Sequence, residues 1–368
     1  MTANETAIGA SSSVENTARE VREEDSFDVE AVDKVLKDHI DGLTGTPAVG
    51  QFAGGASNLT YSLDYPGRSL ILRRPPRGAK PASGHSMIRE YTVIKGLKPV
   101  FPSVPEALYY VDTDNSVLGA EFYVMERVDG LLLEKTIPED WGWTPQDNEK
   151  FCRLFWEKLV ELHAVDYNAA GLGEFGRPQG YVSRQVGGWN KRFEKALTPD
   201  VQPFDDVRDW LDANQPPDVL QSALIHGDFR MDNMILNRSN PFQIDAVLDW
   251  ELSTLGDPLM DLGGALAYWI QDGDPQGFEP LEKQPSRAPG MLRRQQIVDF
   301  YGEKTGITTD DFTFYYVFGL FRLAGIAQQI YFRYHAGQTT NPAFKGFGMA
   351  SQGLCLYCQH LIREGMGS

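Results

Sequence analysis

The 368-residue chain has few cysteines, no long apolar run and no excess of basic residues. Three cysteines are too few for a disulfide framework, and the apolar run at 314–321 ends at Arg322, far short of the roughly 18 residues that a membrane span needs. The net charge of −17 excludes broad basic surfaces for nucleic acid or anionic membranes. The N-terminal residues also lack the pattern of a secretory signal, so we expect a cytoplasmic protein that binds neither nucleic acid nor membrane.

The hydrophobic pattern changes near residue 129 and predicts two lobes. Ser26 is the expected N-cap of a first helix, and the short β-like runs that follow are interrupted by one helical stretch at 86–97. Beyond residue 129 the pattern is mostly helical, with two short β-like runs at 234–236 and 246–250. The expected organisation is a mobile tail over residues 1–25, a β-rich N-lobe over 26–128 and a larger, mainly helical C-lobe over 129–368.

A dense polar motif, HGDFRMDN, occupies residues 226–233 between apolar segments. A further carboxylate, Asp249, follows the second β-like run. Two strands that end side by side would bring the oxygens of Asp228, Asn233 and Asp249 into one cleft. Oxygen ligands of this kind suit Mg²⁺ together with substrate phosphates, and Asp228 could then orient or deprotonate a hydroxyl. The pattern therefore predicts phosphoryl transfer, although an isolated H-G-D would more simply form an Asx turn.

The motifs HGDFRMDN, AVLDW and GDPLMDLG resemble, in order and spacing, those of the phosphotransferase superfamily that contains aminoglycoside and choline kinases. The sequence is most similar to the kinase domains linked to acyl-CoA dehydrogenases and to their stand-alone bacterial relatives. The resemblance implies an α+β, protein-kinase-like bilobal fold and an ATP-dependent kinase that uses Mg²⁺. It further implies that Asp228 and Arg230 are catalytic, that Asn233 and Asp249 bind the metal, and that Asp261 braces the catalytic loop.

The N-lobe carries the expected ATP site. Glycines at 54 and 55 lie between two β-like runs, where backbone N–H groups can approach phosphate oxygens, although a Gly-Gly pair also suits a plain hairpin turn. Arg73 stands where the superfamily usually has a lysine, with Glu90 as its expected partner and with Arg74 and Arg89 as competing assignments. The predicted ATP-binding residues are Gly54, Gly55, Ser57, Asn58, Arg73, Glu90 and, through the backbone of a hinge, Glu126, Arg127 and Val128.

Local charge is the main indication of the acceptor. Residues 171–197 contain five cations and two carboxylates, and residues 282–294 four cations and one carboxylate. A basic pocket suits a phosphate-bearing acceptor such as a CoA thioester, although solvated helix faces have the same composition. The segment 180–192 also resembles that of the dehydrogenase-linked kinases, which implies a 4-hydroxy acid or its CoA thioester as acceptor. Its predicted binding residues are Arg184, Trp189 and Lys191.

Other functions stay open at this point. A kinase of an aminoglycoside, choline-like or sugar-like acceptor would need an acidic pocket beside Asp228. A non-catalytic ATP-binding protein is disfavoured because Asp228, Asn233 and Asp249 are all present. A protein kinase is disfavoured because no activation segment ends in A-P-E.

Overall fold

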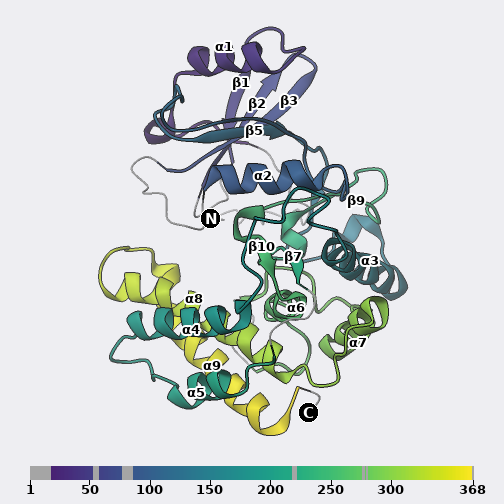
Figure 1. Cartoon of the computed structure of the whole chain (residues 1–368), viewed down its shortest axis with the longest axis vertical. Helices are drawn as coiled ribbons and strands as arrows, with labels where there is room; N and C mark the ends of the chain where they lie inside the picture. The colour runs from purple at the N-terminus through teal and green to yellow at the C-terminus, as the bar shows by residue number, and fades with distance from the viewer. Residues whose placement is uncertain are drawn as a thin grey trace, which may run out of the picture.

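The chain folds into a β-rich lobe above a larger helical lobe, as the sequence predicts (Figure 1). Among the helices that the structure describes, none is long and apolar enough to cross a membrane. Of the predicted ATP-binding residues, Gly54, Gly55 and Ser57 lie outside the described part of the chain, as do residues 1–17 of the predicted tail. The computed structural model describes residues 18–52, 58–76, 86–217, 222–275, 278 and 281–366.

The N-lobe is an antiparallel five-stranded sheet with a helix on each face. Strand alternation in β3 places Leu70 and Leu72 in the core under α1, while Ile71 belongs to the core shared with α2 and the C-lobe. The sheet order is β1-β2-β3-β5-β4. The elements are α1 (Val29–His39), β1 (Ala48–Gln51), β2 (Leu59–Tyr65), β3 (Arg68–Arg74), α2 (Met87–Leu97), β4 (Ala107–Val111) and β5 (Phe122–Glu126).

The chain enters the N-lobe differently from the sequence expectation. Ser26 is not the N-cap of α1; that position is Asp28, whose side chain accepts a hydrogen bond from the backbone N–H of Ala31 at 3.0 Å. The Ser26 hydroxyl instead donates to the carbonyl of Glu23, in the short 3₁₀ turn η1 (Glu23–Asp25). Residues 18–25, assigned by the sequence to the mobile tail, lie against the sheet, where Arg19 pairs with Gln51 through backbone hydrogen bonds.

The C-lobe combines helices with short strand pairs that carry the polar motif. Strand β7 pairs with β10, and β8 pairs with both β6 and β9. Its helices are α3 (Pro145–His163), α4 (Tyr181–Lys195), α5 (Asp205–Ala213), α6 (Pro258–Leu266), α7 (Arg294–Thr305), α8 (Thr313–His335) and α9 (Phe347–Glu364), with 3₁₀ turns η2 (Glu139–Trp141), η3 (Met231–Asn233), η4 (Trp250–Leu252) and η6 (Pro342–Gly346). Its strands are β6 (Leu131–Leu132), β7 (Ala223–Ile225), β8 (Met234–Leu236), β9 (Ile244–Val247) and β10 (Thr254–Gly256).

Helices α6 and α8, which carry Asp261 and Arg322, pack closely through glycines. A Cβ atom on Gly319 of α8 would lie 2.1 Å from the carbonyl oxygen of Gly263 in α6. The reverse contact is equally tight, since a Cβ on Gly263 would lie 2.3 Å from the Tyr315 carbonyl oxygen. Backbone atoms cannot yield as flexible side chains do, so only glycine fits at this crossing.

We expect Gly319→Ala to lower the free energy of unfolding by about 3 kcal/mol, because overpacking forces the two helices apart. Urea unfolding followed by circular dichroism measures the change. Gly187→Ala is the matched control, because a Cβ at Gly187 of α4 meets nothing within 4 Å. Equal stability of the two variants would contradict the close crossing.

Candidate active site

Two short strand pairs bring the polar motif and Asp249 together. Strand β7 ends immediately before His226, and β9 ends two residues before Asp249. The antiparallel pairing of β8 with β9 continues past the strands, where the N–H of Leu248 donates to the carbonyl of Asn233 at 2.8 Å. Asn233 and Asp249 therefore lie on neighbouring chain segments although they are 16 positions apart in the sequence.

His226 fixes the backbone between these segments. Its Nδ1 accepts a hydrogen bond from the N–H of Asp228 at 3.2 Å, and its Nε2 donates to the carbonyl of Leu248 at 2.9 Å. The ring is fully buried and packs on Trp250. Both nitrogens are used by the backbone, so His226 ties the segment of Asp228 to that of Asp249.

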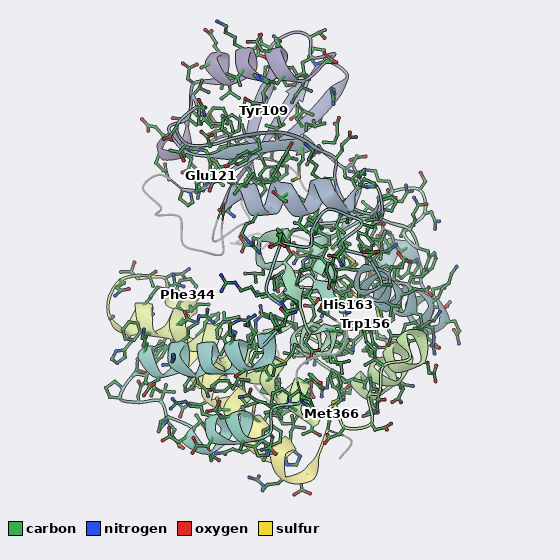
Figure 2. All side chains as sticks on the ribbon, viewed as in Figure 1. Tyr109, Glu121, Trp156, His163, Phe344 and Met366 are labelled. Atoms are coloured by element: carbon green, nitrogen blue, oxygen red, sulfur yellow. The ribbon has the colours of Figure 1, made fainter. Side chains whose placement is uncertain are left out.

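Asp261, at the start of α6, holds the same loop from below. Its carboxylate accepts hydrogen bonds from the N–H groups of His226 and Gly227, each at 2.8 Å. His163 of α3, labelled just above Trp156 in Figure 2, places Nε2 3.1 Å from the same carboxylate. Burial acts to raise the pKa of Asp261, but the contact with His163 and the backbone donor keep it below its usual value. An ionised Asp261 thus braces the loop, as the sequence predicts.

Asp228 lies between an arginine and an amide. Arg230 Nη1 donates to its Oδ1 at 3.0 Å, and Asn233 Nδ2 donates to its backbone carbonyl at 2.9 Å. Arg230 itself is held by Asp232 and lies over the ring of Tyr268. Burial raises the pKa of Asp228, and Arg230 acts against this shift. The amide nitrogen of Asn233 faces Asp228, which leaves its carbonyl oxygen for another partner.

Asp249 has an unusual backbone and an unsatisfied carboxylate. Its φ of 65° and ψ of 61° place it in the left-handed region, which costs energy for a residue other than glycine and is common at functional sites. Its Oδ1 accepts no hydrogen bond from the described residues, and Arg73 Nη2 lies 3.5 Å away. A strained residue whose carboxylate oxygen accepts no hydrogen bond is suited to a cationic ligand.

The N-lobe places Arg73 and Asn58 opposite this carboxylate. Arg73 forms a buried ion pair with Glu90 of α2, and Asn58 Nδ2 donates to Glu251 Oε2 at 3.0 Å. Arg73 Nε and Asn58 Oδ1 have no hydrogen-bond partner among the described residues. Arg74 points to the opposite face of the sheet, where its guanidinium donates to the carbonyl of Asp25. Strand alternation thus puts Arg73, rather than Arg74, between the lobes.

Comparison with known proteins identifies the family. The model of the phosphotransferase enzyme family matches residues 48–296 of this chain. The chain belongs to this family. The predictions of a phosphotransferase, and of a kinase-like fold with a β-rich N-lobe and a helical C-lobe, are therefore confirmed.

Curated relatives of this phosphotransferase are longer proteins. Acyl-CoA dehydrogenase family member 11 of Gallus gallus is 34% identical over 342 residues, which cover 89% of this chain and 42% of that protein. Acyl-CoA dehydrogenase family member 10 of Mus musculus is 33% identical over 351 residues, covering 93% of this chain and 32% of that protein. The phosphotransferase chain thus spans about two fifths or less of the length of these relatives.

Solved structures show the same fold. A Ralstonia eutropha protein provisionally assigned as an aminoglycoside phosphotransferase matches with a TM-score of 0.74 and 30% identity, over 91% of this chain and 99% of that chain. Choline kinase from Cryptosporidium parvum Iowa II matches with a TM-score of 0.63 over 92% of this chain and 97% of that chain. At 11% identity the second match supports the fold alone.

In the predicted hinge of this phosphotransferase, most backbone N–H groups already donate hydrogen bonds within the N-lobe. The N–H of Glu126 donates to Glu106, and that of Arg127 to Ser69. The Glu126 carboxylate pairs with Arg68, and the Arg127 guanidinium lies over the ring of Phe52. Among the described residues, the backbone of Val128 has no such bond. The contact of this hinge with adenine stays a prediction.

The three predicted acceptor residues lie on α4 but have different surroundings. Arg184 donates to the carbonyls of Arg177 and Gln179, so its guanidinium holds the segment before the helix. Lys191 is exposed. Trp189 is partly buried and has the guanidinium of Arg192 4.7 Å from its ring centre. The acceptor role of these residues stays a prediction.

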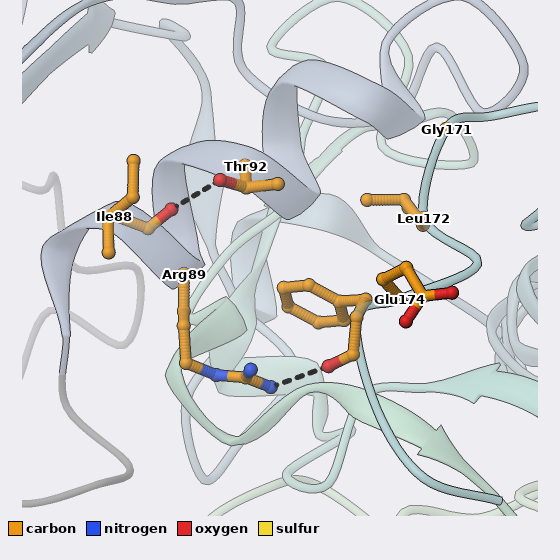
Figure 3. A pocket seen from close by; sticks show the side chains of 7 residues that line it. Ile88, Arg89, Thr92, Gly171, Leu172 and Glu174 are labelled. Carbon is orange, nitrogen blue, oxygen red and sulfur yellow. Dashed lines mark hydrogen bonds between the residues drawn. The ribbon is translucent and has the colours of Figure 1, made fainter.

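A pocket lies between α2 and the C-lobe segment 171–175. Figure 3 shows Arg89 pointing from α2 toward the segment of Leu172 and Glu174. The Arg89 guanidinium stacks 4.3 Å from the ring centre of Phe175 and donates to the carbonyls of Phe175 and Ser253. Arg89, which competed with Arg73 for the phosphate role, thus links α2 to the C-lobe.

Sequence reasoning missed two contributors to the site. Glu251 accepts a hydrogen bond from Asn58. The one feature of the sequence that could have pointed to Glu251 is its position two residues after Asp249. Arg322 of α8 donates to the carbonyl of Gly227, next to Asp228, across 95 residues of sequence. No local pattern indicates that contact, because it arises from the packing of α8 under the loop.

The ion pair between Arg73 and Glu90 predicts a pH effect. Burial raises the pKa of Glu90 to about 7, although Arg73 opposes the shift. A raised pKa means that Glu90 takes up a proton as the pH falls through 7, and Arg73 then loses its partner. As the pH falls from 8 to 6, we expect the KM for ATP of the wild type to rise by more than the protonation of ATP alone would cause.

Glu90→Gln isolates this effect. We expect the variant to have a KM for ATP about tenfold higher at pH 8 and a flatter pH profile, because one charge-assisted partner is lost. Steady-state kinetics at saturating acceptor measures both. Glu121→Gln is the control, since Glu121 lies on the N-lobe (Figure 2) and bonds Tyr110 outside the ion pair. Parallel pH profiles for wild type and Glu90→Gln would contradict the titration of Glu90.

Proposed function

We propose that this phosphotransferase uses Mg²⁺ and ATP to phosphorylate the hydroxyl group of a 4-hydroxy acid or its CoA thioester. The observation that carries the proposal is the convergence of Asp228, Asn233 and Asp249 on neighbouring loops, opposite the Arg73–Glu90 pair of the N-lobe. Phosphoryl transfer depends on positioning the reacting groups and on neutralising the negative charge of the phosphates, and these residues suit both tasks.

The unsatisfied polar atoms support a magnesium–nucleotide ligand. Asp249 Oδ1, Arg73 Nε and Asn58 Oδ1 lack hydrogen-bond partners among the described residues. Within the described ranges, no three His, Cys, Asp or Glu side chains gather into a metal site. A carboxylate with one amide oxygen suits Mg²⁺ that is shared with phosphates, and Arg73 suits the phosphates themselves. Bound Mg²⁺ would neutralise charge on the transferred phosphoryl group.

The remaining roles follow from the surroundings of each side chain. Asp228 orients the acceptor hydroxyl and accepts its proton as the oxygen attacks phosphorus. Arg230 holds the Asp228 carboxylate through Oδ1, while Asn233 and Asp249 bind the metal. Asp261 and His226 keep the loop in place. Asn58 and Arg73 position the nucleotide from the N-lobe, and Val128 contributes the hinge backbone.

Two observations favour an acyl acceptor over a cationic one. The relatives with high coverage of this chain are named acyl-CoA dehydrogenase family members. Arg230 and Arg322 both act on the pKa of Asp228, so a polycationic acceptor would meet guanidinium groups beside the base.

The test is an ATP-consumption screen with 4-hydroxypentanoate, 4-hydroxypentanoyl-CoA, kanamycin and choline. We expect turnover with at least one of the two acyl acceptors at a kcat/KM at least tenfold above that of either cation. Phosphorus NMR of the product identifies the phosphorylated oxygen. Preference for kanamycin or choline would refute the acyl acceptor while leaving the kinase assignment intact.

A further inference from the structure

Arg322 reaches the catalytic loop from the middle of α8. Its Nη2 donates to the carbonyl of Gly227 at 2.7 Å, and its charge lowers the pKa of the adjacent Asp228 against the effect of burial. Gly264 of α6 leaves room for the guanidinium, since a Cβ there would lie 3.3 Å from Arg322 Nη1. The packing of α6 and α8 thus holds a cation beside the proposed base.

Trp189 of α4 packs next to this guanidinium. A Cβ on Gly325, one turn after Arg322 in α8, would lie 3.0 Å from the indole ring. The Arg322 guanidinium carbon is 5.9 Å from the ring centre, and that of Arg192 is 4.7 Å from it. Helices α4 and α8, side by side in the C-lobe of Figure 1, therefore bring one indole ring near an exposed cation, Arg192, and a partly buried one, Arg322.

In the described part of the chain, Arg322 has no carboxylate in direct contact, although Asp228 is near enough for the two charges to interact. Within the described residues, no carboxylate forms an ion pair with it, and Gly227 uses only one of its five N–H donors. Arg230, in contrast, pairs with both Asp228 and Asp232. A partly buried guanidinium with donors to spare and no carboxylate in contact can bind a negatively charged ligand.

We propose that Arg322 and Trp189 form a subsite for the carboxylate of a free hydroxy acid, so that the acid rather than its CoA thioester is the better acceptor. The inference rests on the proposed function. In a 4-hydroxy acid three carbon–carbon bonds join the carboxylate carbon to the carbinol carbon, a span of about 4 Å. Gly227, which Arg322 contacts, directly precedes Asp228. One guanidinium can thus bind the carboxylate while Asp228 receives the hydroxyl, with the carbon chain beside Trp189.

The decisive comparison is between the free acid and its uncharged amide, with the CoA thioester as a third acceptor that lacks the free carboxylate. We expect Arg322→Gln to lower kcat/KM about 30-fold for 4-hydroxypentanoate and less than about threefold for 4-hydroxypentanamide and 4-hydroxypentanoyl-CoA. Arg322→Lys should recover part of the loss, and the KM for ATP should not change. Arg333→Gln, which removes an exposed cation further along α8, is the control and should behave as wild type. An equal loss for all three acceptors would show that Arg322 only supports the loop, and would overturn the subsite.

Binding of unreactive pentanoate separates this inference from the proposed function. We expect calorimetry to show weaker binding of pentanoate to Arg322→Gln than to wild type or Arg333→Gln, with thermal melting to confirm that each variant folds. If pentanoate binds through Arg322 but no acyl acceptor is phosphorylated, the subsite stands and the proposed function fails. If 4-hydroxypentanoate is phosphorylated and neither its turnover nor pentanoate binding depends on Arg322, the proposed function stands and the subsite fails.

Discussion

Replacing Asp228 with Asn is expected to lower kcat about 10³-fold while changing the affinity for MgATP by less than about threefold. The amide keeps the shape of the side chain and can still accept a hydrogen bond from Arg230. It cannot take a proton from the acceptor hydroxyl. Single-turnover kinetics measure the loss of chemistry, and nucleotide titration measures binding separately.

The stability of Asp228→Asn gives an independent check on this prediction. Burial raises the folded-state pKa of Asp228, so the ionised carboxylate at neutral pH destabilises the fold, and this effect disappears as the pH falls. The neutral amide should therefore raise the melting temperature at pH 7, and the difference from wild type should shrink in acid. Asp245→Asn, on β9 and bonded to Asn237 and Gln243, is the control for both measurements. Near-normal turnover by Asp228→Asn would refute the base assignment.

The pattern of the N-lobe could be predicted because its information is local. Alternation in β3 separates Leu70 and Leu72 from Ile71 and Arg73, and the same alternation sends Arg74 away from the cleft. The start of α1 could not be fixed in the same way. Ser26 and Asp28 are both good N-caps in sequence, and only the structure shows that Ser26 closes the turn of η1 while Asp28 caps the helix.

The C-lobe site likewise combines residues that the sequence predicts with contacts that it does not. The spacing of Asp228, Asn233 and Asp249 marks a site because strand ends position all three, and the family match agrees with that motif. Arg322 carries no signal in the sequence, since its contact with Gly227 depends on the glycine crossing of α6 and α8. The net basic charge of residues 171–197 is also a weak indication of the acceptor, because the sequence does not show what each cation contacts. In the structure the Arg184 guanidinium donates to backbone carbonyls, whereas Trp189 lies beside Arg322.

Asp249 offers the strongest test of the metal site. We expect Asp249→Asn to reduce turnover below detection and to remove the dependence of ATP binding on Mg²⁺, with a loss of about 10²-fold or more in affinity for MgATP. The reason is charge, since an amide oxygen is a poor replacement for a carboxylate on a hard cation. Asn also tolerates the left-handed backbone that Asp249 adopts, so the loop should keep its shape.

The measurement is a pair of ATP titrations, with Mg²⁺ and with EDTA, on wild type and variant. In the wild type Mg²⁺ should strengthen ATP binding, whereas in Asp249→Asn the two titrations should coincide. Loss of the carboxylate also frees Arg73, whose Nη2 lies 3.5 Å from Oδ1, so binding of metal-free ATP should weaken little or even improve. Asp232→Asn is the matched comparison, because Asp232 bonds Arg230 and should leave the magnesium effect unchanged. A magnesium effect of wild-type size in Asp249→Asn would show that Asp249 does not bind the metal. The left-handed backbone of this residue would then have no role in metal binding.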